Sequence, residues 1–252
     1  MSARPVSASP PGPVLIVGAL SDIGAAVASA WAERGRPLIL AARESARLAP
    51  MASDLALRYG AAVRTVECDV LAIDPAAFLD SLGETPAVLV CVVGLLGDQG
   101  EAERDPGAFR LVVESNFTAP AALIGEAANR MAGRGAGVIV GVSSVAGERG
   151  RASNYAYGAA KAGLTAFLSG LRNRLAGAGV RVITVLPGFV DTRMTAGMKL
   201  PAALTARPEE VAKAILAAEA RGRDVIWVRP VWRWIMLVIR LIPESIFKRL
   251  KL

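Results

Sequence analysis

The sequence predicts an α/β fold: a doubly wound domain around a seven-stranded parallel sheet with helices on both faces, followed by an amphipathic helical tail. Short apolar runs alternate with helical patterns, which is typical of such a sheet. No linker composition interrupts the alternation, so we expect one domain. With 53% hydrophobic residues and a positive mean hydropathy, the chain can bury a large core. The predicted parts are a disordered tail over 1–12, the domain over 13–228 and a basic tail over 229–252.

The elements follow from the apolar runs taken in order. Strands are expected at 14–18, 37–42, 62–68, 87–93, 137–143, 180–187 and 224–228. Helices are expected at 22–34, 44–59, 106–131, from the region of Tyr157 to 175, and at 208–220.

Cysteine use and the first residues indicate a cytoplasmic chain. Cys68 and Cys91 both fall in apolar, strand-like runs, so we expect reduced core thiols, with no disulfide and no metal site. The opening MSARPVSASPPGP lacks the apolar stretch of a secretion signal.

A glycine-containing turn follows the first strand and opens the first helix. Glycines let the backbone approach a pyrophosphate, and the helix N-terminus directs free N–H groups towards it; a simple tight turn is the alternative. A carboxylate disfavours a neighbouring diphosphate, so Asp22 is expected to point away as the helix N-cap. The predicted cofactor contacts in this turn are Gly18, Leu20, Ser21, Asp22, Ile23 and Gly24.

The end of the second strand indicates which nucleotide is bound. An acid there would bind the ribose 2′-hydroxyl and repel a 2′-phosphate, whereas this chain has Ala41, Ala42 and Arg43. The guanidinium of Arg43 suits a phosphate, which favours NADPH over NADH. The alternative is an ordinary helix-capping arginine.

Tyr157 and Lys161 stand four residues apart, so on a helix their side chains share one face. A neighbouring ammonium favours the phenolate, which would lower the pKa of a phenol that normally titrates near ~10. The chain has no histidine, so this pair is its candidate proton donor at neutral pH. Ser144, at the end of the fifth strand, could bind the same substrate oxygen. On spacing alone, two surface neighbours remain the alternative.

Together, the glycine turn, Ser144 and the Tyr-x-x-x-Lys motif resemble the short-chain dehydrogenase/reductase family, from about Val14 to Ile226. The resemblance implies a Rossmann-type fold and hydride transfer between a nicotinamide cofactor and a carbonyl carbon. Tyr157 would give the proton, Ser144 would hold the oxygen, and Lys161 would lower the tyrosine pKa and bind the nicotinamide ribose.

Further site residues are implied by the same resemblance. Asn116 matches the family asparagine that supports a proton relay to the lysine; an unremarkable helix asparagine is the alternative. Asp69 resembles the aspartate that contacts adenine. The chain has Cys91-Val92-Val93-Gly94 where the family usually has Asn-Asn-Ala-Gly, so only the glycine is retained. Outside the glycine turn, the implied cofactor contacts are Arg43, Asp69, Val70, Gly94, Tyr157, Lys161, Pro187, Gly188, Val190 and Thr192.

The C-terminal segment is basic and apolar. Eight basic and two acidic residues follow from Arg221 onward, so this segment carries +6 of the net +7. Between Val231 and Ile242 a helix would span only ~18 Å, too short for a bilayer core of ~30 Å. Trp232, Trp234, Met236 and Ile239 with nearby arginines suit a helix at a membrane surface, although packing on the domain or on a second subunit is the alternative. No motif for nucleic acid accompanies the charge.

Five segments resemble one branch of the family, the reductases of a 2-keto pentofuranose on a polyprenyl phosphate, which form the reductase half of decaprenylphosphoryl-ribose 2′-epimerase. They are 94–98, 143–149, 153–163, 187–194 and 242–250. This implies a lipid-linked ketone, a separate FAD-dependent oxidase that makes it, a homo-oligomer, and a position at the inner face of the cell membrane. Two other functions stay open: reduction of another lipophilic ketone, and non-catalytic NADPH binding beside a membrane enzyme.

Overall fold

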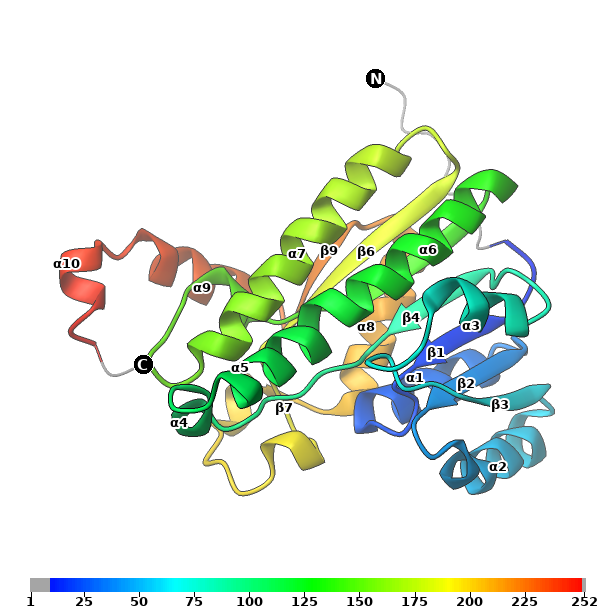
Figure 1. The fold of residues 1–252 in the computed structure, drawn as a ribbon, viewed down its shortest axis with the longest axis horizontal. Helices are drawn as coiled ribbons and strands as arrows, with labels where there is room; N and C mark the ends of the chain where they lie inside the picture. The colour runs from blue at the N-terminus through cyan, green and yellow to red at the C-terminus, as the bar shows by residue number, and fades with distance from the viewer. Residues whose placement is uncertain (1–9, 251–252) are drawn as a thin grey trace.

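The seven predicted strands form one parallel sheet. A computed structural model describes residues 10–250 of the chain, and its sheet has the order β3-β2-β1-β4-β5-β6-β9 (Figure 1). The order reverses between β1 and β4, which is the position where doubly wound sheets open a crevice. The strands are β1 (Val14–Val17), β2 (Leu38–Ala42), β3 (Val63–Glu67), β4 (Val88–Cys91), β5 (Gly137–Val142), β6 (Val180–Pro187) and β9 (Val225–Val228). A separate pair, β7 (Phe189–Val190) and β8 (Thr205–Ala206), follows β6.

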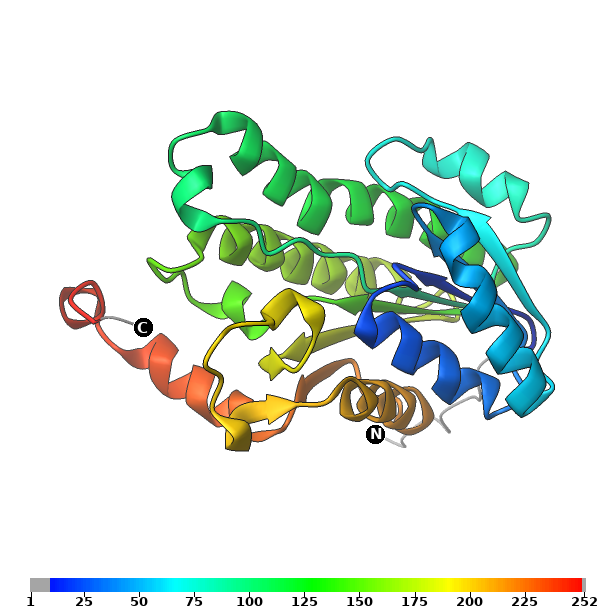
Figure 2. The same cartoon turned by 90° about the horizontal axis from the view of Figure 1, so that it is seen from below.

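Helices cover both faces of the sheet, as Figure 2 shows. Successive side chains of a strand point to opposite faces. The covering helices are α1 (Asp22–Ala32), α2 (Ala49–Tyr59), α3 (Pro75–Ser81), α6 (Ala119–Arg134), α7 (Tyr155–Leu175) and α8 (Pro208–Arg221). In β1, Val14 and Ile16 therefore join the core under α1, α2 and α8, while Leu15 and Val17 join the core under α3, α6 and α7. The shorter helices are η1 (Ser45–Leu48), α4 (Gln99–Ala102), η3 (Val145–Glu148), η4 (Arg193–Thr195) and η5 (Ala202–Leu204).

The helix predicted over 106–131 is not one regular helix. It consists of α5 (Pro106–Val113), a π-helical turn η2 (Glu114–Thr118) and α6, which continues to Arg134. The wider turn buries Asn116 completely. Isolated π-helical turns often occur at functional sites. The hydrophobic pattern predicted a single continuous helix here and did not reveal this turn.

The C-terminal tail has two apolar faces. α9 (Val231–Leu241) buries Trp232 and Met236 against Val145 and Leu186, and α10 (Glu244–Phe247) buries Phe247. The prediction that Trp232 and Met236 face a membrane surface is therefore wrong, since both side chains belong to the domain core.

Trp234, on the opposite face of α9, is 62% exposed, and both views show the tail extending beyond the body of the domain (Figures 1 and 2). Among residues 10–250, no helix has the length and hydropathy needed to cross a bilayer.

At the other end, residues 1–9 of the predicted disordered tail lie outside the described range. The next residues contact the domain: the Arg36 guanidinium donates to the carbonyls of Pro10 at 2.9 Å and Gly12 at 2.8 Å.

Candidate functional site

A cavity of about 500 Å³ lies at the carboxyl ends of β1, β2, β3 and β4. Seven of the predicted cofactor contacts line it: Gly18, Leu20, Ser21, Arg43, Asp69, Val70 and Gly94. Lining residues that the sequence did not indicate include Glu44, Arg47, Leu111, Ser115, Arg193 and Met194. The cavity therefore spans the reversal of strand order, where α/β folds bind nucleotides.

The glycine turn has the geometry that a pyrophosphate requires. Gly18 has φ +88°, a backbone conformation that is unfavourable for residues other than glycine. A Cβ on Gly24 would lie 2.5 Å from the carbonyl oxygen of Gly18, so only glycine fits there. The Ser21 hydroxyl accepts from the Gly24 N–H at 3.0 Å and thereby caps α1. The turn and the helix N-terminus thus fit the diphosphate of a dinucleotide.

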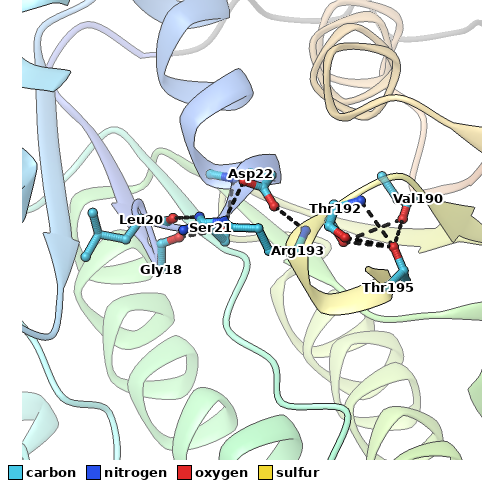
Figure 3. Close-up of polar contacts among 9 residues, drawn as sticks. Gly18, Leu20, Ser21, Asp22, Val190, Thr192, Arg193 and Thr195 are labelled. Carbon is cyan, nitrogen blue, oxygen red and sulfur yellow. Dashed lines mark hydrogen bonds and ion pairs between the residues drawn. The ribbon is translucent and has the colours of Figure 1, made fainter. Parts of the chain in front are cut away.

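The predicted role of Asp22 as N-cap is wrong, because Ser21 holds that position and Asp22 is the first residue of α1. The Asp22 carboxylate instead accepts from Arg193, at 2.8 Å from the main-chain N–H and 2.9 Å from Nε (Figure 3). The Arg193 guanidinium also donates to the carbonyl of Leu20. Arg193 follows Thr192 in the motif after β6, so this contact joins two predicted parts of the site.

Beyond β2 the cavity carries both signs of charge. Arg43 and Arg47 line it with Glu44, whose carboxylate accepts from Arg47 Nη1 at 3.2 Å. The Glu67 carboxylate accepts from the N–H groups of Glu44 at 2.9 Å and Ser45 at 2.7 Å, and the hydrogen bond from the Ser45 N–H is the main reason that the pKa of Glu67 is lowered. Arg43 has no such intramolecular ion pair among the described residues. Its guanidinium is therefore available to a phosphate group.

Ser144, Tyr157 and Lys161 lie together at one side of the cavity. Ser144 lies two residues beyond the end of β5 and caps η3, and its side chain interacts with that of Tyr157. Lys161, on the same helix α7 as Tyr157, is 2% exposed, with Nζ 5.7 Å from the centroid of the Tyr157 ring. Nζ donates to the carbonyls of Val142 at 3.1 Å and Val93 at 3.3 Å. Val93 lines the cavity, so the lysine adjoins it.

The pKa of Tyr157 shifts in the direction opposite to the predicted one. Burial raises the Tyr157 pKa to about 12, with the Ser144 hydrogen bond acting against it. Burial also lowers the pKa of Lys161 to about 8. The prediction assumed that the ammonium lies against the phenol oxygen, whereas its hydrogen bonds go to main-chain carbonyls. Tyr157 consequently keeps its proton at neutral pH.

Asn116 holds the segment after β4. Its amide nitrogen donates to the carbonyls of Leu95 at 2.6 Å and Val112 at 2.8 Å, and its oxygen accepts from the Leu95 N–H at 3.2 Å. A Cβ on Gly94 would lie 3.1 Å from the Asn116 oxygen and 3.4 Å from Lys161 Nζ. Asn116, Gly94 and Lys161 are therefore immediate neighbours, and the proton relay to the lysine that the resemblance implies stays a prediction.

The remaining predicted contacts are not among the residues that line the cavity. They are Asp22, Ile23, Gly24, Tyr157, Lys161, Pro187, Gly188, Val190 and Thr192. Thr192 is bound locally, since its N–H donates to the Thr195 hydroxyl at 3.1 Å. Gly188 packs against the tail: a Cβ there would lie 1.9 Å from Trp232 Nε1. The direct cofactor roles of these residues remain predictions.

Comparison with known proteins agrees with this geometry. Residues 13–201 match the short chain dehydrogenase family. An oxidoreductase of Mycobacterium tuberculosis with no characterised activity is 39% identical over 242 residues, covering 94% of this chain and 96% of that protein. The cis-4-hydroxycyclohexanecarboxylate dehydrogenase of Sinomonas cyclohexanicum is 34% identical over 226 residues, covering 82% of this chain and 89% of that protein.

A solved structure gives the same result for the fold. A short-chain dehydrogenase from Sphingobium yanoikuyae in complex with NADPH superposes with a TM-score of 0.79 at 28% identity, covering 93% of this chain and 97% of that one. The residues that match the short chain dehydrogenase family include the glycine turn, Ser144, Tyr157 and Lys161, since all fall within 13–201. The chain is therefore a member of the short-chain dehydrogenase/reductase family of oxidoreductases.

Proposed function

We propose that this protein is an NADPH-dependent ketoreductase whose substrate is a 2-keto pentofuranose carried on a polyprenyl phosphate. The observation that carries the reaction type is the grouping of Ser144 and Tyr157 with the buried ammonium of Lys161, next to a cavity that fits a dinucleotide. Bound NADPH supplies a hydride to the carbonyl carbon. Side chains of the protein protonate the carbonyl oxygen and stabilise its charge.

Tyr157 supplies the proton. Its raised pKa keeps the hydroxyl protonated at neutral pH, so it can protonate the oxygen that becomes negative as the hydride arrives. The Ser144 hydroxyl donates to the same oxygen and stabilises its charge. Lys161 is held by the carbonyls of Val93 and Val142, which keeps its charge close to the tyrosine and to the cavity.

Arg43 supports the choice of NADPH, together with the NADPH bound in the Sphingobium relative. A hydrogen bond from a guanidinium to a phosphate contributes about 1.5–3 kcal/mol, so Arg43→Ala should raise KM for NADPH by about tenfold or more. The KM for NADH, which lacks the 2′-phosphate, should change by less than about threefold on the same scale. Equal changes for the two cofactors would contradict this role of Arg43.

The outer face of the tail supports a membrane-borne substrate. On α9 the side chains of Val231, Trp234, Leu237, Val238 and Leu241 are exposed, and Arg233 and Arg240 are exposed beside them. An apolar stripe flanked by arginines suits the surface of an anionic bilayer. We infer peripheral contact of this face with the membrane that carries the polyprenyl phosphate.

Vesicle binding tests the membrane contact with a matched control. Leu241→Glu should release the protein from phosphatidylglycerol vesicles in a sedimentation assay, because a carboxylate on the stripe opposes both lipid burial and anionic headgroups. Leu57→Glu is the control, since Leu57 is 87% exposed on α2, away from the tail. If both variants bind like the wild type, the tail does not contact the membrane.

The substrate is tested directly. NADPH oxidation should be measured with polyprenyl-phosphoryl 2-keto-ribose, the product expected of an FAD-dependent oxidase, and Tyr157→Phe should abolish it. Full activity of Tyr157→Phe would refute the assignment of the acid.

A second candidate is another lipophilic or cyclic ketone, favoured by the relative named for cis-4-hydroxycyclohexanecarboxylate. Turnover of 4-oxocyclohexanecarboxylate but not of the keto-sugar would support that candidate and refute the keto-sugar.

A further inference from the structure

We propose that Asp22 and Arg193 are positioning residues for the bound dinucleotide. The pair, called here the clasp, ties the segment after β6 to the glycine turn across the cavity, and Arg193 cancels a carboxylate charge at the pyrophosphate site. The inference rests on the NADPH binding of the proposed function.

The clasp connects two walls of the same cavity. Gly18, Leu20 and Ser21 line one wall, and Arg193 lines another. The two residues of the clasp are 171 positions apart in sequence. Two hydrogen bonds join them, one from the Arg193 main-chain N–H and one from its Nε, and a third runs from the guanidinium to the Leu20 carbonyl. Figure 3 shows the arginine reaching from its loop to the start of α1.

Two features distinguish the clasp from an ordinary surface ion pair. Ion pairs such as Asp54–Arg58 on α2 join residues four apart on one helix, where they constrain nothing else. Asp22 instead binds the N–H of the peptide bond between Thr192 and Arg193, so it fixes the main chain of the opposite loop. The Asp22 side chain is also only 30% exposed, whereas that of Arg193 is 67% exposed, so solvent and salt screen the pair mainly from the arginine side.

The electrostatics explain why an aspartate is tolerated beside a diphosphate. The N-terminus of α1 attracts negative charge, and a bound pyrophosphate would bring it there. The Asp22 carboxylate at the first helical position repels that charge. The Arg193 guanidinium, within hydrogen-bond distance of the carboxylate, offsets the repulsion. Removing Arg193 alone should therefore weaken NADPH binding more than removing both charges.

NADPH binding to the full-length protein tests this asymmetry without any ketone present. Affinity is measured from the fluorescence of bound NADPH, and its dissociation rate by stopped-flow displacement with NADP⁺. We expect Arg193→Ala to raise the Kd for NADPH about tenfold, with the difference from wild type shrinking at high salt. Asp22→Asn should change the Kd less but speed dissociation, because the loop is no longer held. Asp22→Asn/Arg193→Ala should bind more tightly than Arg193→Ala.

Controls separate the clasp from a loss of folding. Asp54→Asn breaks a surface pair away from the cavity and should leave the Kd and the dissociation rate unchanged. Arg193→Lys keeps the charge and should restore most of the affinity. Thermal unfolding without cofactor should show that each variant is folded.

Either of two results would overturn the positioning role of the clasp. One is a Kd for NADPH of Arg193→Ala within twofold of the wild-type value, and the other is a double variant that binds NADPH as weakly as Arg193→Ala. If the wild type itself does not bind NADPH, the proposed function fails first, so the two failures are distinguishable.

Discussion

Lys161 gives the sharpest test of the energetics of the site. Its ammonium is buried at the site and held by two carbonyls, and burial lowers its pKa from 10.5 to about 8. At pH values between these two pKa values, the Lys161 side chain is protonated in the unfolded chain and deprotonated in the folded chain. Stability therefore rises with pH through this window, and below about pH 8 the full cost of burying the charge is present.

The size of the effect follows from the shift. Each pKa unit corresponds to about 1.4 kcal/mol, so the lowered pKa of Lys161 changes the free energy of unfolding by about 3 kcal/mol across this pH window. Lys161→Met removes the titrating group and leaves two carbonyls without a donor. The difference in unfolding free energy between the wild type and Lys161→Met should thus grow in favour of the wild type by about 3 kcal/mol from pH 7.5 to pH 10.5.

Urea unfolding of the cofactor-free protein at a series of pH values measures this difference. Subtracting the variant cancels the opposing titrations of Tyr157 and Cys68, whose raised pKa values make stability fall at higher pH. A difference that stays constant within 1 kcal/mol across the window would refute the burial argument and the position assigned to the ammonium.

Two further predictions concern the supports of the site. Gly188→Ala should lower the free energy of unfolding by about 1–3 kcal/mol, because its Cβ would overlap the buried ring of Trp232. Thermal unfolding measures this loss. Gly170→Ala is the control, since a Cβ at Gly170 meets nothing within 4 Å and the variant should not be destabilised. Asn116→Ala should lower the free energy of unfolding by about 2 kcal/mol. It should also speed hydrogen exchange of the Leu95 amide, since that amide donates to the Asn116 oxygen. Unchanged exchange at Leu95 would contradict the view that Asn116 supports this segment.

The sheet and the positions of the proposed catalytic residues were predictable from sequence because each depends on a local pattern. The β strands appear as apolar runs, and the four-residue spacing of Tyr157 and Lys161 survives because α7 is regular throughout. Ser144 follows β5 as expected. Fold and motifs were therefore accessible without tertiary information.

The features that the sequence did not reveal depend on contacts between distant segments. Nothing in the residues around Asp22 indicates a partner 171 positions away, so its carboxylate was assigned to the nearer helix N-terminus. The direction of the Tyr157 shift required knowing that the Lys161 ammonium bonds to carbonyls. Trp232 and Trp234 are two residues apart in one apolar run, and only packing shows that one is core and the other surface.

The π-helical turn at Glu114–Thr118 constrains how this chain can change in length. Such a turn contains one residue more than the α-helical turn it replaces. Deleting a single residue there would relax it to a regular helix and rotate the preceding side chains by ~100° relative to α6. The Asn116 amide would then face away from Leu95, although every residue that binds or reacts would still be present. In this segment, residue count is as much a determinant of the site as residue identity.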